Sequence, residues 1–207
     1  MAVTQEIEAL ALLEIEGLPR AIRAQDAALK KAPMRVLACT PVSPGKAILL
    51  LGGDVASVEE ALKDAEEIVG ARRLDRLFLP GVHPDVVRAI TGGRAETRRD
   101  ALAILELTTV AAAIVAADAA VKSAHVTIGR LHLATGFGGR GFFTLLGEQG
   151  DVEAAVAAAG AVVGDKLCDH EIIPAPHDEL YDAAFVRTWP LDPADGPVSG
   201  TSTRSRE

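Results

Sequence analysis

The glycine-rich run at residues 136–141 is the first place where residue types and spacing suggest chemistry. It matches G-x-G-x-x-G, a pattern that holds a dinucleotide when a strand precedes it and a helix begins directly after it. Residues 142–146 (FFTLL) favour a strand instead, so the helix N-terminus that would bind a pyrophosphate is missing. The run Pro44-Gly45-Lys46 lacks the earlier glycine and the following Ser or Thr of a phosphate-binding loop. Neither run predicts a nucleotide site.

The titratable side chains form no catalytic or metal-binding pattern. The histidines, which show no ligand spacing such as H-E-x-x-H, are His83, His125, His132, His170 and His177. Cys168, Asp169 and His170 are consecutive, but neighbours on a strand point to opposite faces and cannot form a nucleophile–base pair. Glu14 and Glu106 occupy matching places in a repeat, which favours a structural hydrogen-bonding role. We therefore predict neither an enzyme nor a metal site.

Two copies of one unit must position these residues. Residues 9–36 align with residues 101–128 at an offset of 92, and 13 of the 28 pairs are identical. Beyond the next predicted strand the offset becomes 94, because the loop at 132–139 is two residues longer than its counterpart. The expected segments are an N-terminal extension (1–8), a first domain (9–90), a linker (91–100), a second domain (101–187) and a disordered tail (188–207).

The hydrophobic periods predict the same element order, β-α-β-β-α-β-α, in both copies. The predicted strands are 9–15, 34–41, 47–51 and 74–79 in the first copy, and 101–107, 126–134, 141–146 and 168–173 in the second. The predicted longer helices are 17–31, 55–69, 109–123 and 151–163. Thr109 is placed to cap one helix, and Ser57 with Glu60 has capping-box spacing in another. The fold class is α/β (α+β, ferredoxin-like), with a mixed or antiparallel sheet and helices on one side.

Composition excludes several classes of function. Of the 207 residues 49% are apolar, but only seven are aromatic, so Ala, Val, Leu and Ile must build the core. A net charge of -8 argues against binding nucleic acid, which needs clustered basic residues. No signal peptide and no apolar run of about 18 residues is present, which argues against a membrane protein. Cys39 and Cys168 lack C-x-x-C spacing and suit a reducing cytoplasm.

Both copies carry [GT]-x-x-x-A-I-x-A-x-D-A-x-x-K-x-A after their first strand, and a later strand that ends in P-x-x-H. This pattern resembles the bacterial microcompartment shell domain, over about residues 9–90 and 101–185. Two such domains in unpermuted order resemble the tandem-domain class of shell protein, particularly that of propanediol-type compartments. The resemblance implies two tandem shell domains whose homotrimer forms a pseudohexameric tile without enzymatic activity.

The resemblance further implies that two loops meet at the three-fold axis and line a pore. The expected pore-lining residues are Val42, Ser43, Pro44, Gly45, Gly136, Phe137, Gly138 and Gly139. Lys46 and Arg140 are expected near the opening, where their charges would favour polar or anionic solutes. Some family members carry a Cys before Pro-Gly-Lys and hold an iron–sulfur cluster on the axis. This chain has Ser43 there, and such clusters need thiolates, so we expect no cofactor.

The family pattern also places Lys30, Lys122, His83 and His177 at the tile edges, where neighbouring tiles meet. The two histidines both follow a strand-ending proline, which on the residues alone favours a structural turn role. A solvated lysine at a helix end is the simpler explanation for residue type alone, but recurrence within the motif favours the edge role. The expected partners are other shell hexamers and pentamers and the encapsulated enzymes, within a microcompartment shell in the bacterial cytoplasm. The alternative is a trimeric small-molecule-binding regulatory protein, whose site would use the longer loop at 132–139.

Overall fold

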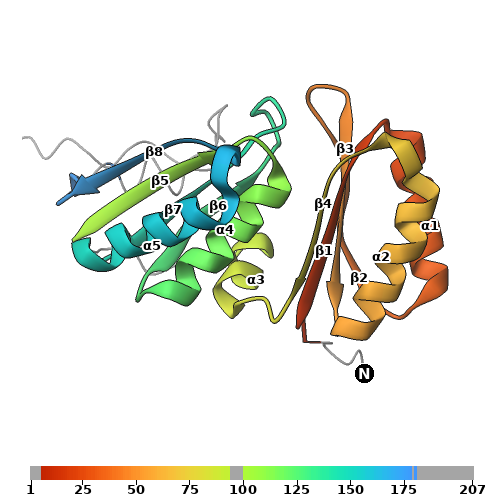
Figure 1. Cartoon of the computed structure of the whole chain (residues 1–207), viewed down its shortest axis with the longest axis horizontal. Helices are drawn as coiled ribbons and strands as arrows, with labels where there is room; N and C mark the ends of the chain where they lie inside the picture. Colours follow the sequence, from red (N-terminus) through yellow and green to blue (C-terminus); the bar gives the residue numbers. More distant parts are fainter. Residues whose placement is uncertain (1–5, 94–99, 179, 181–207) are drawn as a thin grey trace, which may run out of the picture. The chain divides into compact units, whose positions relative to one another are not determined.

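Each copy of the repeat folds around its own antiparallel sheet (Figure 1). The first copy consists of β1 (Ala9–Glu16), α1 (Leu18–Lys31), β2 (Arg35–Val42), β3 (Lys46–Gly53), α2 (Val55–Val69), η1 (Gly70–Arg72), β4 (Arg73–Pro80) and α3 (Pro84–Ile90). The second consists of β5 (Ala101–Leu107), α4 (Val110–Ser123), β6 (Thr127–Leu133), β7 (Gly141–Gly147), α5 (Gln149–Val163), η2 (Gly164–Lys166) and β8 (Leu167–Pro174). The computed structural model describes residues 6–93, 100–178 and 180.

The strand order is β2-β3-β1-β4 in one sheet and β6-β7-β5-β8 in the other. The first strand of each copy is therefore central and runs antiparallel to both neighbours. This confirms the predicted antiparallel α+β fold, and every predicted strand and longer helix agrees with the observed bounds to within two residues.

The chain divides into two units, residues 1–176 and residues 177–207. Both sheets lie in the first unit. In the second, the backbone N–H of Leu180 donates to the carbonyl of His177 (2.9 Å). Most of the predicted terminal helix of the second copy, the linker at 94–99, the tail at 188–207 and residues 1–5 lie outside the described residues.

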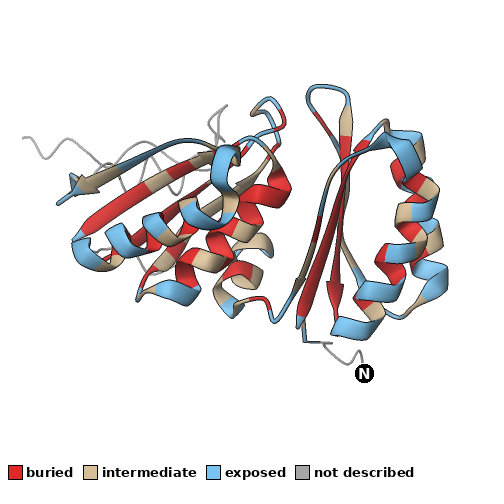
Figure 2. Ribbon diagram, in the orientation of Figure 1, coloured by how far each residue is buried: buried red, intermediate tan, exposed pale blue. Residues whose placement is uncertain are grey.

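The strand β1 is buried on both faces, which explains its almost unbroken apolar sequence (Figure 2). Ala11 and Leu13 pack against the buried side of α1 and α2. Leu10 and Leu12 point the other way and belong to a cluster that also contains the core of the second domain. We call the face opposite α1 and α2 the outer face of the first sheet, and the face opposite α4 and α5 the outer face of the second.

Two helix starts test the predicted caps. The Thr109 hydroxyl accepts a hydrogen bond from the N–H of Ala112 (3.1 Å), as predicted. The capping box at Ser57 and Glu60 is wrong, because α2 already begins at Val55 and its cap is Asp54. The Asp54 carboxylate accepts from the N–H of Ser57 (2.9 Å). Asp54, which directly follows β3, occupies the N-cap position of α2, so Ser57 lies within the first turn of the helix.

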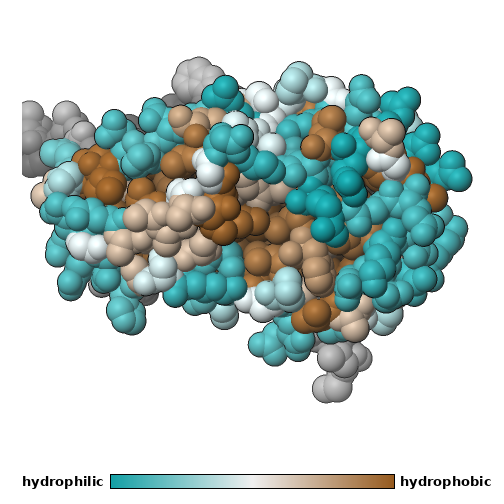
Figure 3. Space-filling view, in the orientation of Figure 1, coloured by the Kyte–Doolittle hydropathy of each residue, from teal (hydrophilic) through white to brown (hydrophobic). Residues whose placement is uncertain are grey.

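The outer face of the first sheet packs against the second domain. Leu12, Leu50 and Leu77 from this face share one buried cluster with Val110 and Ile114 of α4. Figure 3 shows apolar surface where α3 and α4 meet the first sheet. Burial of this face makes the contact between the domains part of the hydrophobic core.

Polar contacts fix the register of the two domains. The N–H of His83 donates to Asp118 (2.8 Å), Arg88 to the carbonyl of Ile128 (2.7 Å), and Lys166 to Asp75 (2.7 Å). Burial opposes ionisation of Asp75, but hydrogen bonds from Lys166 and Thr109 outweigh burial and lower the pKa of its carboxyl group. Directional contacts of this kind fix one arrangement where apolar packing alone would tolerate sliding.

Candidate functional site

Two glycine-bearing loops connect equivalent strands of the two domains. The first loop, residues 43–45, joins β2 to β3, and the second loop, residues 134–140, joins β6 to β7. Within the second loop the N–H of Phe137 donates to Ala134 (3.2 Å) and that of Arg140 to Phe137 (3.0 Å). Seven of the residues that the family resemblance assigned to a pore lie in these loops: Ser43, Pro44, Gly45, Gly136, Phe137, Gly138 and Gly139. Val42, which was also assigned to the pore, is the last residue of β2 and is buried in the core.

The two loops touch each other within one chain. Gly139 has a φ of +78°, and a Cβ placed on it would lie 2.7 Å from the Ser43 carbonyl and 2.6 Å from Cε of Lys46. Both the left-handed backbone and the close approach require glycine at this position. The structure thus brings together Ser43, Lys46 and Gly139, three of the residues that the sequence assigned to one site.

The two basic residues beside these loops are each paired with a carboxylate. The Lys46 ammonium donates to the fully buried Glu14, whose other oxygen accepts from the N–H groups of Val110 (2.6 Å) and Ala111 (3.1 Å). Arg140 donates to Glu106. The predicted structural role of Glu14 is confirmed. The charges of Lys46 and Arg140 were expected to favour polar or anionic solutes; each cation lies against its own anion, which weakens the preference for anions.

An aromatic cluster that sequence reasoning missed supports the second loop. His132 stacks on Phe142, with centroids 4.8 Å apart and planes at 19°, and Phe137 packs edge-on to both rings. The Arg130 guanidinium lies 5.4 Å from the centroid of Phe142. The His132 Nε2 lies 2.7 Å from the Thr135 carbonyl oxygen. The sequence did contain a signal for this cluster, because Phe137 and Phe142 are two of only five phenylalanines in the chain and lie close to the same loop.

This environment also sets the protonation of His132. Burial lowers its pKa, the nearby Thr135 carbonyl opposes that effect, and the charge of Arg130 adds to the lowering. The lowered pKa favours the neutral imidazole, which stacks on Phe142 as an aromatic ring. The cluster holds the second loop by packing and adds no charge of its own except that of Arg130.

The two lysines assigned to tile edges each lie in an ion pair near the end of a helix. Lys30 pairs with Asp26 (2.6 Å) near the end of α1, and Lys122 pairs with Asp118 (2.5 Å) near the end of α4. Lys30 is well exposed, whereas the Asp118 partner of Lys122 is buried at the contact between the domains.

The two histidines assigned to the edges differ in their surroundings. His83 caps α3, where its Nδ1 accepts from the N–H of Asp85 (3.2 Å), and its own N–H reaches Asp118. His177 is exposed and belongs to the unit at residues 177–207. The local capping role of His83 follows from these contacts, and the tile-edge role of both histidines stays a prediction.

Neither a metal site nor a membrane-spanning helix is found among the residues that the structure describes. Among them, no group of three or more His, Cys, Asp or Glu side chains is arranged to hold a metal ion. Within the same ranges, no helix combines the length and apolar character needed to cross a membrane.

Residues 9–82 and 101–176 both match the family model of the BMC domain. The chain belongs to the bacterial microcompartment shell protein family. It is 38% identical over 176 residues to the bacterial microcompartment shell protein PduT of Citrobacter freundii, an alignment that covers 84% of this chain and 96% of that protein.

Solved structures agree with this assignment. A microcompartment protein from Desulfitobacterium hafniense DCB superposes with a TM-score of 0.79 at 38% identity, over 84% of this chain and 98% of that one. A fused permuted hexameric shell protein from the RMM microcompartment superposes with a TM-score of 0.57 at 22% identity, over 74% and 84%, and supports the fold alone.

The tandem shell-domain prediction is thus confirmed, and so is the structural, non-enzymatic function. The chain is a component of a bacterial microcompartment shell. The alternative of a small-molecule-binding regulator receives no support from these relatives.

Proposed function

We propose that this shell protein is a homotrimeric tile with pseudo-six-fold shape. The observation that carries the proposal is the contact between the two domains of one chain, in which the outer face of one sheet covers α4 of the next domain. This contact joins unlike surfaces of two similar domains. Repetition of a heterologous contact closes into a ring when its rotation allows, and three chains supply six domains.

In this tile the two loops meet around a central opening. The proposed lining comprises Val42 at the end of β2, Ser43, Pro44 and Gly45 from the first loop, and Gly136, Phe137, Gly138 and Gly139 from the second. Contact between Gly139 and Ser43 within one chain supports a shared location. Lys46 and Arg140 stand beside the opening with their charges balanced by Glu14 and Glu106. Hydroxyl and backbone groups then dominate the rim, which suits small polar metabolites without strong selection for anions.

The proposed partners of the tile are other hexamers and pentamers of the same shell, met along its edges, and encapsulated enzymes, met on a face. Lys30, Lys122, His83 and His177 are the proposed edge residues. The exposure of Lys30 and its short pairing with Asp26 are compatible with a side chain that is available at a rim.

Sedimentation equilibrium of the full chain tests the tile directly. We expect a species of three times 21.6 kDa at micromolar concentration, and hexagonal particles or sheets in electron micrographs. The physical reason is that both unlike surfaces of the chain are satisfied only when a ring closes. A stable monomer or dimer over this concentration range would contradict the proposal.

The tile edge is tested by the double variant Lys30→Ala/Lys122→Ala. We expect trimers to remain intact while the extent of sheets seen by electron microscopy falls, because both lysines would lie between tiles. Each single variant should have little effect, since rim charges contribute about 0–1 kcal/mol each. The control is Lys63→Ala, an exposed lysine on α2 with two nearby glutamates. If the double variant forms sheets of unchanged extent, both lysines are solvated residues at helix ends and do not contact neighbouring tiles.

A further inference from the structure

We infer that a second copy of this chain lays its α1 and η1 against the outer face of the second sheet, with Arg72 of that copy bound to Asp169. The inference rests on the proposed trimer and assigns its contact residues. It follows from comparing two equivalent surfaces of one molecule. One of them is covered within the chain, and its equivalent is open.

The helices α4 and α1 supply the first half of the comparison. At the repeat offset of 92, Val110 and Ile114 of α4 correspond to Leu18 and Ile22 of α1. The α4 residues are both 0% exposed, because the first sheet covers them. Their α1 equivalents are 38% and 50% exposed. Large apolar side chains of one stripe are thus covered in one domain and left open in the other, as expected of a surface that awaits a partner.

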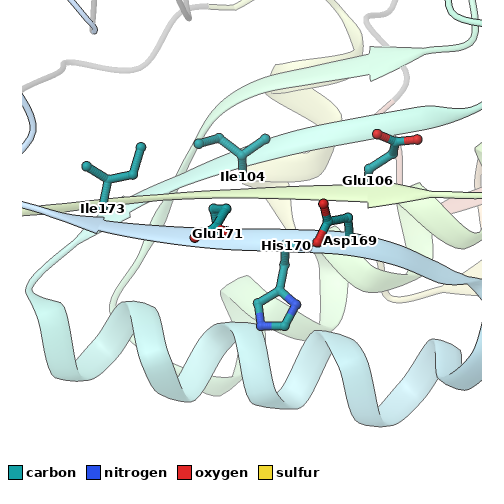
Figure 4. Close-up of a pocket in the computed structure, with 6 residues that line it drawn as sticks. All are labelled: Ile104, Glu106, Asp169, His170, Glu171 and Ile173. Carbon is teal, nitrogen blue, oxygen red and sulfur yellow. Dashed lines mark hydrogen bonds between the residues drawn. The ribbon is translucent and has the colours of Figure 1, made fainter.

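The sheets supply the second half. Leu12 on the outer face of the first sheet is fully buried against the second domain, and its equivalent Ile104 is only partly buried. Ile104 lines a surface hollow on the second sheet with Glu106, Asp169 and Ile173. Figure 4 shows Ile104, Glu106 and Ile173 extending away from α5, which places them on the outer face. This hollow is the equivalent of the surface on which α4 rests in the first domain.

Charges on the two surfaces match in the same way. Asp75 accepts from the N–H of Arg76 (2.9 Å) and binds Lys166 of the other domain (2.7 Å). Its equivalent Asp169 accepts from the N–H of the next residue, also at 2.9 Å. In the described part of the chain no cationic side chain lies within ion-pair distance of Asp169.

The cation that would complete this pair is present at the matching position. Lys166 corresponds, at the offset of 94, to Arg72 at the end of η1. Arg72 is exposed, and its contact in the chain is a long one to the exposed Glu16 (3.9 Å). Repetition of the contact between the domains therefore brings Arg72 of one copy to Asp169 of the next.

Glu106 adds one hydrogen bond to this contact. Glu14 accepts from two N–H groups at the start of α4 while it holds Lys46. Glu106 holds Arg140 in the same manner, and α1 begins at Leu18 with Gly17 at its cap position, so it has no side-chain cap. Because Pro19 has no N–H, only one of the two backbone bonds can be repeated, at the N–H of Leu18. The contact between copies is thus similar to the contact within a chain, with one hydrogen bond fewer.

A charge exchange tests the pairing. Arg72→Asp and Asp169→Arg should each raise, by about tenfold or more, the concentration at which half of the chain is assembled, because like charges then face each other. The double variant should return this concentration to within about threefold of wild type, since the pair is restored with its order reversed. The readout is sedimentation equilibrium. The control is Glu67→Lys, an exposed charge reversal on α2 at a position whose second-domain equivalent, Ala161, is also exposed.

The outcomes separate this inference from the proposed trimer. If both single variants form trimers as readily as the wild type, the Arg72–Asp169 pairing is wrong, while the proposed trimer still holds. Failure of the double variant to recover would overturn it as well. A wild-type chain that never assembles would overturn the trimer itself. The neutral variants Arg72→Gln and Asp169→Asn should weaken assembly less than the charge reversals do. Circular dichroism of every variant verifies that a loss of assembly does not come from misfolding.

Discussion

Replacing Glu14 with alanine should lower the free energy of unfolding by about 3–5 kcal/mol, the range seen when one partner of a buried ion pair is removed. The Glu14 side chain is fully buried, and that of its partner Lys46 is only 12% exposed. The substitution leaves the Lys46 ammonium without a counter-ion. It also leaves the N–H groups of Val110 and Ala111 without the carboxylate that they bind at the start of α4.

Chemical denaturation at one fixed protein concentration measures this loss, since the stability of an oligomer depends on concentration. Glu14→Gln keeps an acceptor oxygen and should lose less than Glu14→Ala. The matched control is Glu16→Ala, two residues further along the same strand, where the exposed side chain should contribute at most about 0.5 kcal/mol. If Glu14→Ala and Glu16→Ala lower the free energy of unfolding equally, the buried contacts of Glu14 with Lys46 and with the start of α4 do not stabilise the chain.

The repeat made most of the fold predictable from sequence. Two alignable copies double the evidence for each strand and helix, and the unbroken apolar run of β1 indicates a strand covered on both faces. The sequence could not tell which surfaces are covered within the chain. Leu12 and Ile104 are similar residues at equivalent positions, yet only Leu12 lies under the other domain. That difference is set by which surfaces the two domains of one chain bring together, and the residue types of either copy do not contain this information.

The candidate site was predictable in its loops but not in its charges. Glycine-bearing segments at equivalent places indicated two loops of similar role, and the structure brings Gly139 against Ser43. The pairing of Lys46 with Glu14 depends on β1 lying beside β3, which places Glu14 opposite Ile48 and two residues from Lys46 in register. Such a neighbour becomes visible only once the strand order is known. A basic residue beside a loop therefore predicts a charged rim only when its own sheet carries no carboxylate beside it.

Replacing Ile22 with glutamate should abolish trimers at micromolar concentration while the chain itself stays folded. Ile22 is 50% exposed in the chain, so a carboxylate there costs little before assembly. In the inferred contact it would be buried against the second sheet of a neighbour. An unpaired buried charge costs about 3–5 kcal/mol, which corresponds to a weakening of more than about 100-fold at each contact.

The equivalent change Ile114→Glu should instead unfold the chain, because Ile114 is 0% exposed beneath the first sheet. Val162→Glu provides the control, since this residue on α5 is 53% exposed and lies outside the inferred contact. Sedimentation gives the assembly state and circular dichroism gives the fold. If Ile22→Glu forms trimers as stable as those of Val162→Glu, then α1 does not take part in the contact between copies. If the Ile114→Glu chain is as stable as the wild type, the packing of α4 against the first sheet does not contribute to stability. The equivalent contact of α1, which was inferred from that packing, would then lose its support.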